Sequence, residues 1–136
     1  MKRWLFTIFA ALALAGCSAA ADTKAAEAGV AKFHTDMDAG KYAQIYAASA
    51  VEMKSSISRD DFIKLLTGMH DKLGPYKSGK TTSWNVNVGT GGHMVTLQRE
   101  VQFGRGPGTE EFVFRVQGNR AILAGWHVNS NALVTG

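Results

Sequence analysis

Apolar residues recur at helical spacing between residues 25 and 39, directly before Gly40. Successive members are four, three and four positions apart, which places them on one face of an amphipathic helix. These members are Ala26, Val30, Phe33 and Met37. The pattern predicts a helix over 25–39 that packs this face against a core and ends at the glycine.

A second, shorter helix is expected after Gly40, because Tyr42, Ile45 and Tyr46 fall on one helical face. Residues 49–56 show no clear period. We therefore expect this stretch to be irregular or a short extended piece.

The third helix is predicted over 58–73, with a start and a stop that are both visible. Ser58 is a good N-cap, since its hydroxyl can accept from the backbone of Asp61. Gly74 and then Pro75 end the helix, because glycine tolerates a left-handed conformation and proline cannot continue a helix. The expected buried residues are Phe62, Leu65, Leu66, Met69 and Leu73.

Beyond Tyr76 the period changes to two, which indicates β-strands. The alternating apolar residues form four groups: Thr82, Trp84, Val86 and Val88; Val95, Leu97, Val101 and Phe103; Phe112, Phe114 and Val116; Ile122, Ala124, Trp126 and Val128. Tight glycine-containing turns separate the groups, so neighbouring strands must be antiparallel. The fold class expected is α+β, with three N-terminal helices on one face of a curled, cone-like, four-stranded antiparallel sheet whose polar face meets water.

The N-terminus has the features of a secretory leader. Lys2 and Arg3 are followed by an apolar region of eleven residues, Trp4 to Leu14, which is too short to span a bilayer. The string L-A-G-C at 14–17 resembles the lipobox of bacterial lipoproteins. That resemblance implies cleavage between Gly16 and Cys17 and a diacylglyceryl group on the Cys17 thiol. The alternative is an ordinary signal peptide cut near 19–21.

The lipoprotein resemblance also suggests a location and a domain organisation. In lipoproteins the residue after the cysteine influences sorting, and here it is Ser18, not an aspartate. This implies export to the outer membrane, with the domain facing the periplasm. The alternatives are the inner membrane and the cell surface. We expect a signal peptide over 1–16, a lipidated cysteine and tether over 17–24, and one α+β domain over 25–136. The alanines of the tether could equally begin the first helix.

The composition limits the classes of partner that the chain is expected to bind. Hydrophobic residues make up 46% and charged residues 19% of the chain, which indicates a globular domain. The net charge of +4 includes Lys2 and Arg3, which leave with the leader and reduce the cations to thirteen against eleven anions. These cations are scattered singly, so nucleic acid is not an expected partner. The single cysteine excludes an internal disulfide.

Two segments carry a likeness at the level of the fold. Residues 25–130 resemble bacterial exported proteins of the nuclear-transport-factor-2-like or cystatin-like type. The resemblance rests on Asp38-Ala39-Gly40-Lys41-Tyr42 leading to Tyr46, and on Phe62 to Gly74 ahead of a strand meander. The resemblance implies a pocket between the helices and the concave sheet. Some members, such as ketosteroid-isomerase-like enzymes, place a catalytic carboxylate there.

In this chain the apolar phase of the strands offers no carboxylate. Arg99 is the only charged residue that falls among the apolar ones, and a buried arginine needs a partner or an anionic ligand. The alternatives to a ligand contact are a β-bulge that turns Arg99 outward, a position at a strand end, or a structural ion pair. Trp84 and Trp126 share the apolar phase and are expected in the core. The residues that could contact a ligand or partner are Arg99, Trp84, Trp126 and Tyr42.

No motif for catalysis is visible. His34, His70, His93 and His127 lie on four different elements without metal-ligand spacing, and H-E-x-x-H and G-x-S-x-G are absent. The loop 104–108 joins two strands and is expected to be a hairpin turn, not a phosphate loop. We therefore predict neither catalytic residues nor a metal or other cofactor.

The function expected is a non-enzymatic, membrane-tethered periplasmic module that binds an envelope protein or a small ligand. One alternative is a small cone-fold enzyme that uses Arg99 or Tyr42 in a pocket. Another is an envelope structural or immunity-type protein whose role is to dock one partner.

Overall fold

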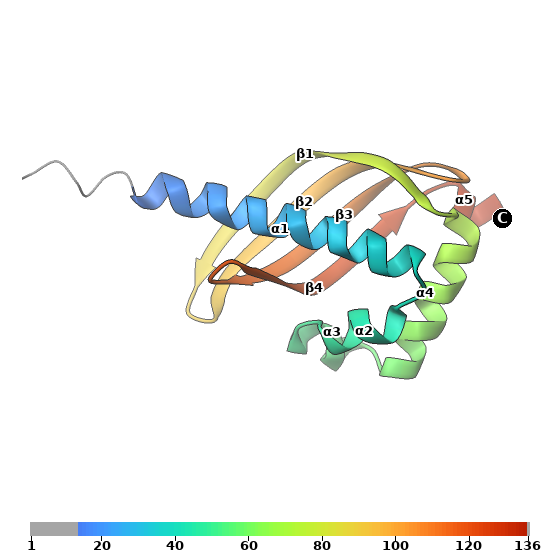
Figure 1. The fold of residues 1–136 in the computed structure, drawn as a ribbon, viewed down its shortest axis with the longest axis horizontal. Coiled ribbons are helices and arrows are strands. Elements are labelled where there is room, and N and C mark those ends of the chain that lie inside the picture. Colours follow the sequence, from blue (N-terminus) through green and yellow to red (C-terminus); the bar gives the residue numbers. More distant parts are fainter. Residues whose placement is uncertain (1–13, 136) are drawn as a thin grey trace, which may run out of the picture.

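The computed structural model describes residues 14–135, with side chains from residue 19 onward. Residues 1–13 of the expected signal peptide over 1–16 lie outside this range. The elements are α1 (Leu14–Asp38), α2 (Tyr42–Ala47), α3 (Val51–Ser56), α4 (Arg59–Leu73), β1 (Tyr76–Gly89), β2 (Gly92–Phe103), β3 (Gly106–Gln117), β4 (Arg120–Asn129) and α5 (Ala132–Thr135). Helices precede an open four-stranded antiparallel sheet, so the α+β fold class is confirmed (Figure 1).

The sheet is a meander in the order β1-β2-β3-β4, as the tight turns require. Its strands are longer than the alternation indicated. β1 already begins at Tyr76, where it pairs with Phe103, and β3 begins at Gly106 within the expected turn. The register of β1 against β2 shifts twice, between Tyr76 and Ser78 and between Thr81 and Ser83.

Helix α1 lies along the concave face of the sheet (Figure 1). The predicted stripe is confirmed, since Ala26, Val30, Phe33 and Met37 are at most 4% exposed. They pack against inward residues of the two central strands, which are Val95, Leu97, Phe112, Phe114 and Val116. Burial of this apolar area is the main favourable contribution to folding of the domain.

Helix α4 has the predicted ends. The Ser58 hydroxyl accepts from the backbone N–H of Asp61 at 3.2 Å, and Gly74 adopts a φ of 74° just after the last turn. Phe62, Leu66 and Leu73 are buried. Leu65 is 50% exposed, so its place in the buried stripe was wrong. It lines a surface hollow together with Leu133 of α5.

Helix α3 corrects the expectation that residues 49–56 are irregular or extended. None of its residues is buried, which explains the missing periodicity. Long-range contacts hold it instead. The backbone N–H of Ala50 donates to the carbonyl of Leu123 in β4 at 2.7 Å, and Glu52 forms an ion pair with Arg115 of β3.

Residues 17–24, expected as a tether, belong to α1. The alternative that their alanines begin the first helix is therefore correct. Asp22 within it is only 6% exposed and pairs with His93 at the start of β2. Among the described residues, no helix is both long and apolar enough to cross a bilayer.

Candidate functional site

A cluster of ionisable side chains lies under α1. Arg99 of β2 and Glu110 of β3 are Cα partners, and their side chains turn inward to exposures of 6% and 1%. Glu110 corrects the expectation that the inward phase holds no carboxylate. The apolar alternation was counted from Phe112, but β3 starts at Gly106, and Glu110 has the same phase as Phe112.

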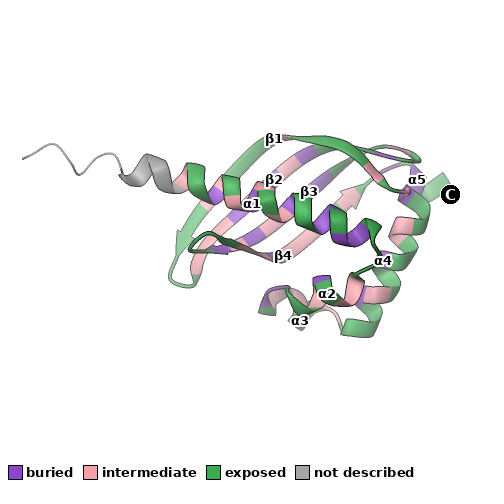
Figure 2. Cartoon of the chain, in the orientation of Figure 1, coloured by how far each residue is buried: buried purple, intermediate pink, exposed green. Residues whose placement is uncertain are grey.

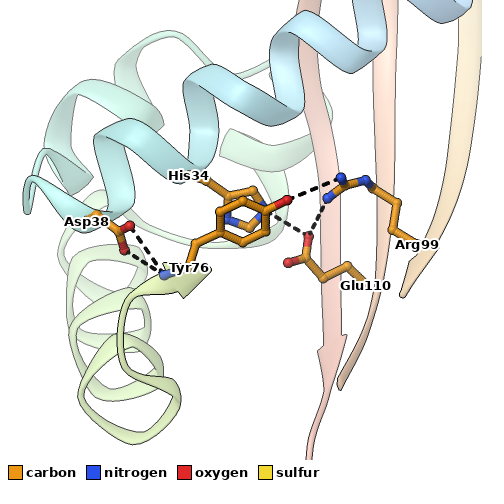
Figure 3. Close-up of polar contacts among 5 residues, drawn as sticks. All are labelled: His34, Asp38, Tyr76, Arg99 and Glu110. Carbon is orange, nitrogen blue, oxygen red and sulfur yellow. Dashed lines mark hydrogen bonds and ion pairs between the residues drawn. The ribbon is translucent and has the colours of Figure 1, made fainter. Parts of the chain in front are cut away.

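The cluster is completed from α1 and β1 (Figure 3). Nε2 of His34 lies 3.0 Å from Oε2 of Glu110 in a buried hydrogen bond. The His34 ring stacks on Tyr76, with centroids 3.8 Å apart and planes 13° from parallel. The Tyr76 hydroxyl accepts from Nη2 of Arg99 at 3.3 Å. Arg99, Glu110, His34 and Tyr76 thus each contact the next, and Tyr76 contacts Arg99 again.

Arg99 therefore has the structural ion pair that the sequence left open as one alternative. Its Nη1 is 3.9 Å from Oε2 of Glu110. Within the described chain, Nε and Nη1 of Arg99 and Oε1 of Glu110 have no hydrogen-bond partner. A buried arginine and carboxylate neutralise each other's charge even where individual hydrogen bonds are missing. An anionic ligand is therefore not required here.

A small cavity adjoins this cluster. It measures about 10 Å³, close to the volume needed for one water molecule, and His34, Asp38, His70, Tyr76 and Trp126 are among its lining residues. Asp38 accepts from the Tyr76 backbone N–H at 3.3 Å and lies 3.0 Å from Nε2 of His70. The cavity is too small for an organic substrate.

Three of the four histidines are thus paired with carboxylates from distant elements: His34 with Glu110, His70 with Asp38 and His93 with Asp22. Sequence reasoning missed these pairs. In the described part of the chain no three histidine, cysteine or acidic side chains gather as a metal site would require.

A second hollow lies elsewhere, between α1, α2 and the start of β4. We call it the α1–β4 groove; its volume is about 330 Å³. It is lined by Ala25, Ala28, Gly29, Lys32, Phe33, Asp36, Gln44, Ile45, Ala48, Phe114, Asn119, Arg120, Ala121, Ile122 and Leu123. Volumes from about 300 Å³ upward are typical of small-molecule sites.

The groove has an apolar floor and charged groups at its margin. Gly29 allows α1 to approach the sheet closely, since a Cβ there would meet Cε1 of Phe114 at 2.8 Å. Lys32 pairs with Asp36 one helical turn away. Arg120 is exposed, and it forms no ion pair with any residue that the structure describes.

The remaining predicted contact residues, Tyr42, Trp126 and Trp84, do not line the α1–β4 groove. Tyr42 packs at the margin of the core, where burial, and then Asp71 and Asp38, raise the pKa of its hydroxyl above 10.0. Trp126 is half-buried, lines the small cavity and lies 4.8 Å from Phe33 between ring centroids.

Trp84 corrects a second expectation, because it is 55% exposed and not in the core. Its Cα partner is the fully buried Leu97, so Trp84 does face the helical side of the sheet. However, β1 is an edge strand, and Figure 2 shows it exposed along most of its length. Sequence alternation reports the face of a residue, not whether a helix covers it.

A family model for the prokaryotic membrane lipoprotein lipid attachment site matches residues 1–18. The match covers the L-A-G-C string and supports a membrane-anchored lipoprotein with lipid on Cys17. No curated protein matches the chain.

Proposed function

We propose that this lipoprotein is a non-enzymatic binding module that holds a small amphiphilic ligand in the α1–β4 groove. The observation that carries the proposal is the groove itself, about 330 Å³ in volume with a floor of apolar side chains. A hollow of this size admits a small organic molecule, whereas the cavity beside His34 has room only for about one water.

The ligand chemistry follows from the lining. Phe114, Ala121 and Leu123 offer an apolar surface to a hydrocarbon or ring system. Arg120 stands at the margin with an exposed guanidinium, which favours a carboxylate, sulfonate or phosphate head group. The ligand class is therefore an amphiphile with an apolar body and an anionic head, such as a fatty acid.

The ionisable cluster supports a non-enzymatic role for the domain. A general acid or base must reach its substrate directly or through one water. His34, Arg99 and Glu110 are 6% exposed or less, and their charges are directed at one another. We assign the cluster to stability of the fold.

We further propose that the anchor lies in the outer membrane with the domain in the periplasm. The residue after the lipidated cysteine influences sorting in lipoproteins, and here it is Ser18. Separation of inner and outer membranes tests this. Ser18→Asp is expected to move the protein to the inner membrane; wild-type protein found in the inner membrane would contradict the proposal.

Ligand binding can be tested with a diazirine-bearing fatty acid added to vesicles that contain the mature lipidated protein. After irradiation, peptide mass spectrometry locates the label. We expect labelled residues within 25–36 and 119–123, the two segments that form most of the groove.

Two matched variants of α1 control this experiment. Ala28→Trp fills the groove from an exposed position and is expected to abolish labelling, whereas Ala31→Trp, also exposed but outside the groove, should leave it unchanged. Arg120→Glu should weaken labelling by repelling the anionic head group. Undiminished labelling in Ala28→Trp would contradict the proposal. Loss of it in Ala31→Trp would do the same.

A further inference from the structure

The chain between the lipid-attachment cysteine and the body of the domain is short. Asp22 is 6% exposed and is held by His93 at the start of β2. Cys17 precedes Asp22 by five residues. This segment spans about 8 Å as a helix and at most about 18 Å when fully extended. The lipid must therefore enter the bilayer close to the end of the sheet that holds His93.

The part of β1 that leads to the first hairpin approaches the same point. The Thr81 hydroxyl donates to the carboxylate of Glu27 on α1. Further along β1, Val88 is the Cα partner of His93, which binds Asp22. Between these two contacts β1 runs beside α1 toward the anchor. Figure 1 shows α1 projecting past the sheet at this hairpin end, with α5 at the opposite end.

Two large apolar side chains are exposed on this stretch of β1. Trp84 is 55% exposed and Val88 is 76% exposed. Both belong to the sheet face that carries α1, because their Cα partners Leu97 and His93 face the helix. The described part of the chain leaves them uncovered, at the place where the anchor brings the domain to the membrane.

The charge at this end suits a lipid surface. Lys24 on α1 and Arg120 at the start of β4 are exposed cations. The nearby acidic groups are hydrogen-bonded within the domain, Asp22 to His93 and Glu27 to the Thr81 hydroxyl. Exposed cations beside bilayer head groups are attracted to anionic lipids.

We propose that the hairpin end of the domain docks on the bilayer, with Trp84 and Val88 in the interface. The occupant of this surface is the membrane that holds the lipid of Cys17. Tryptophan is enriched at the level of lipid head groups, where its ring is half in apolar surroundings and its N–H can remain hydrated. The inference depends on lipidation at Cys17 and is independent of the groove.

Tryptophan quenching tests the proposal on the mature lipidated protein in vesicles. The mature chain has two tryptophans, Trp84 and Trp126, so the difference between wild type and Trp84→Phe reports Trp84 alone. Vesicles that contain phospholipids brominated near the head group are expected to reduce wild-type emission. The Trp84→Phe variant should lose this reduction, and Val88→Asp should diminish it by lifting the hairpin from the apolar layer.

A tryptophan at the opposite end provides the matched control. Val134 in α5 is 85% exposed, and Val134→Trp in the Trp84→Phe background should remain unquenched. Equal quenching of wild type and Trp84→Phe would overturn the proposal, as would strong quenching at position 134. If a second copy of the chain covered Trp84 instead, its emission would shift to the blue in unbrominated vesicles too and would not respond to bromine. That result would also overturn the proposal.

Discussion

Arg99 and Glu110 stand directly opposite each other on β2 and β3, and both side chains are buried beneath α1. Their charges compensate, and His34 adds a hydrogen bond to the carboxylate. A buried ion pair contributes little net stability compared with apolar residues, but loss of one partner leaves an uncompensated buried charge. Loss of one partner should therefore destabilise the domain more than replacement of both by apolar residues.

Glu110→Leu is expected to destabilise the domain by about 3–5 kcal/mol, because Arg99 loses its carboxylate in a buried site. Urea unfolding followed by circular dichroism measures the change. Glu100→Leu is the matched control: Glu100 neighbours Arg99 on β2 but is exposed and pairs with exposed Lys80, so the expected effect is about 0.5 kcal/mol or less.

The double variant Arg99→Met, Glu110→Leu distinguishes a lost pair from poor packing. Removal of both charges should restore most of the stability lost in Glu110→Leu, since no unpaired charge remains. A loss in the double variant equal to the sum of the two single losses would mean that the residues do not act as a pair.

Two helical glycines should respond oppositely to alanine. At Gly29 a Cβ would meet buried Phe114 at 2.8 Å, so Gly29→Ala should destabilise by about 1–3 kcal/mol. At Gly68 in α4 the added Cβ meets nothing within 4 Å, so Gly68→Ala should stabilise by about 0.5–1 kcal/mol through its higher helix propensity. Thermal and urea unfolding measure both. Stabilisation by Gly29→Ala would contradict the close packing of α1 on β3.

The hydroxyl of Tyr42 should make stability depend on alkaline pH. Its pKa is raised above 10.0 in the folded protein, chiefly by burial, so unfolding favours loss of the proton. The contribution is complete below pH 10.0 and is lost as pH rises from 10.0 through the folded-state pKa.

Comparison with Tyr42→Phe isolates this effect. The free energy of unfolding of the wild type should fall more steeply above pH 10.0 than that of the variant. Tyrosinate absorbance gives an independent measurement. The absorbance that Tyr42→Phe lacks should appear at a higher pH than that of an ordinary tyrosine. Identical alkaline slopes for the two proteins would refute the assignment.

Cys17→Ala should abolish incorporation of labelled fatty acid and release the domain from membranes, because the thiol is the site of lipid attachment. Stable anchoring takes at least two acyl chains, so apolar contact by Trp84 and Val88 alone should not hold the protein on the bilayer. Membrane fractionation measures release. Full retention of Cys17→Ala in the membrane fraction would contradict lipid anchorage.

Local signals along the chain were enough for several features. These features are the lipobox at 14–17, the helix predicted over 58–73 and the alternation through Val95 and Leu97. Each depends on residues that are close in sequence. Short turns then left an antiparallel meander as the only arrangement of the strands. The sequence by itself therefore determined the attachment site, the order of most elements and the fold class.

Other features depend on where α1 lies across the sheet, and tertiary structure alone decided them. The inward carboxylate of Glu110 required the true start of β3, and its partner His34 is distant in sequence. Trp84 has the apolar phase but is exposed, because α1 covers the central strands and leaves the β1 edge open. The groove exists because small residues of α1 meet β4 there. These relationships join residues far apart in the chain, so no local pattern contains them.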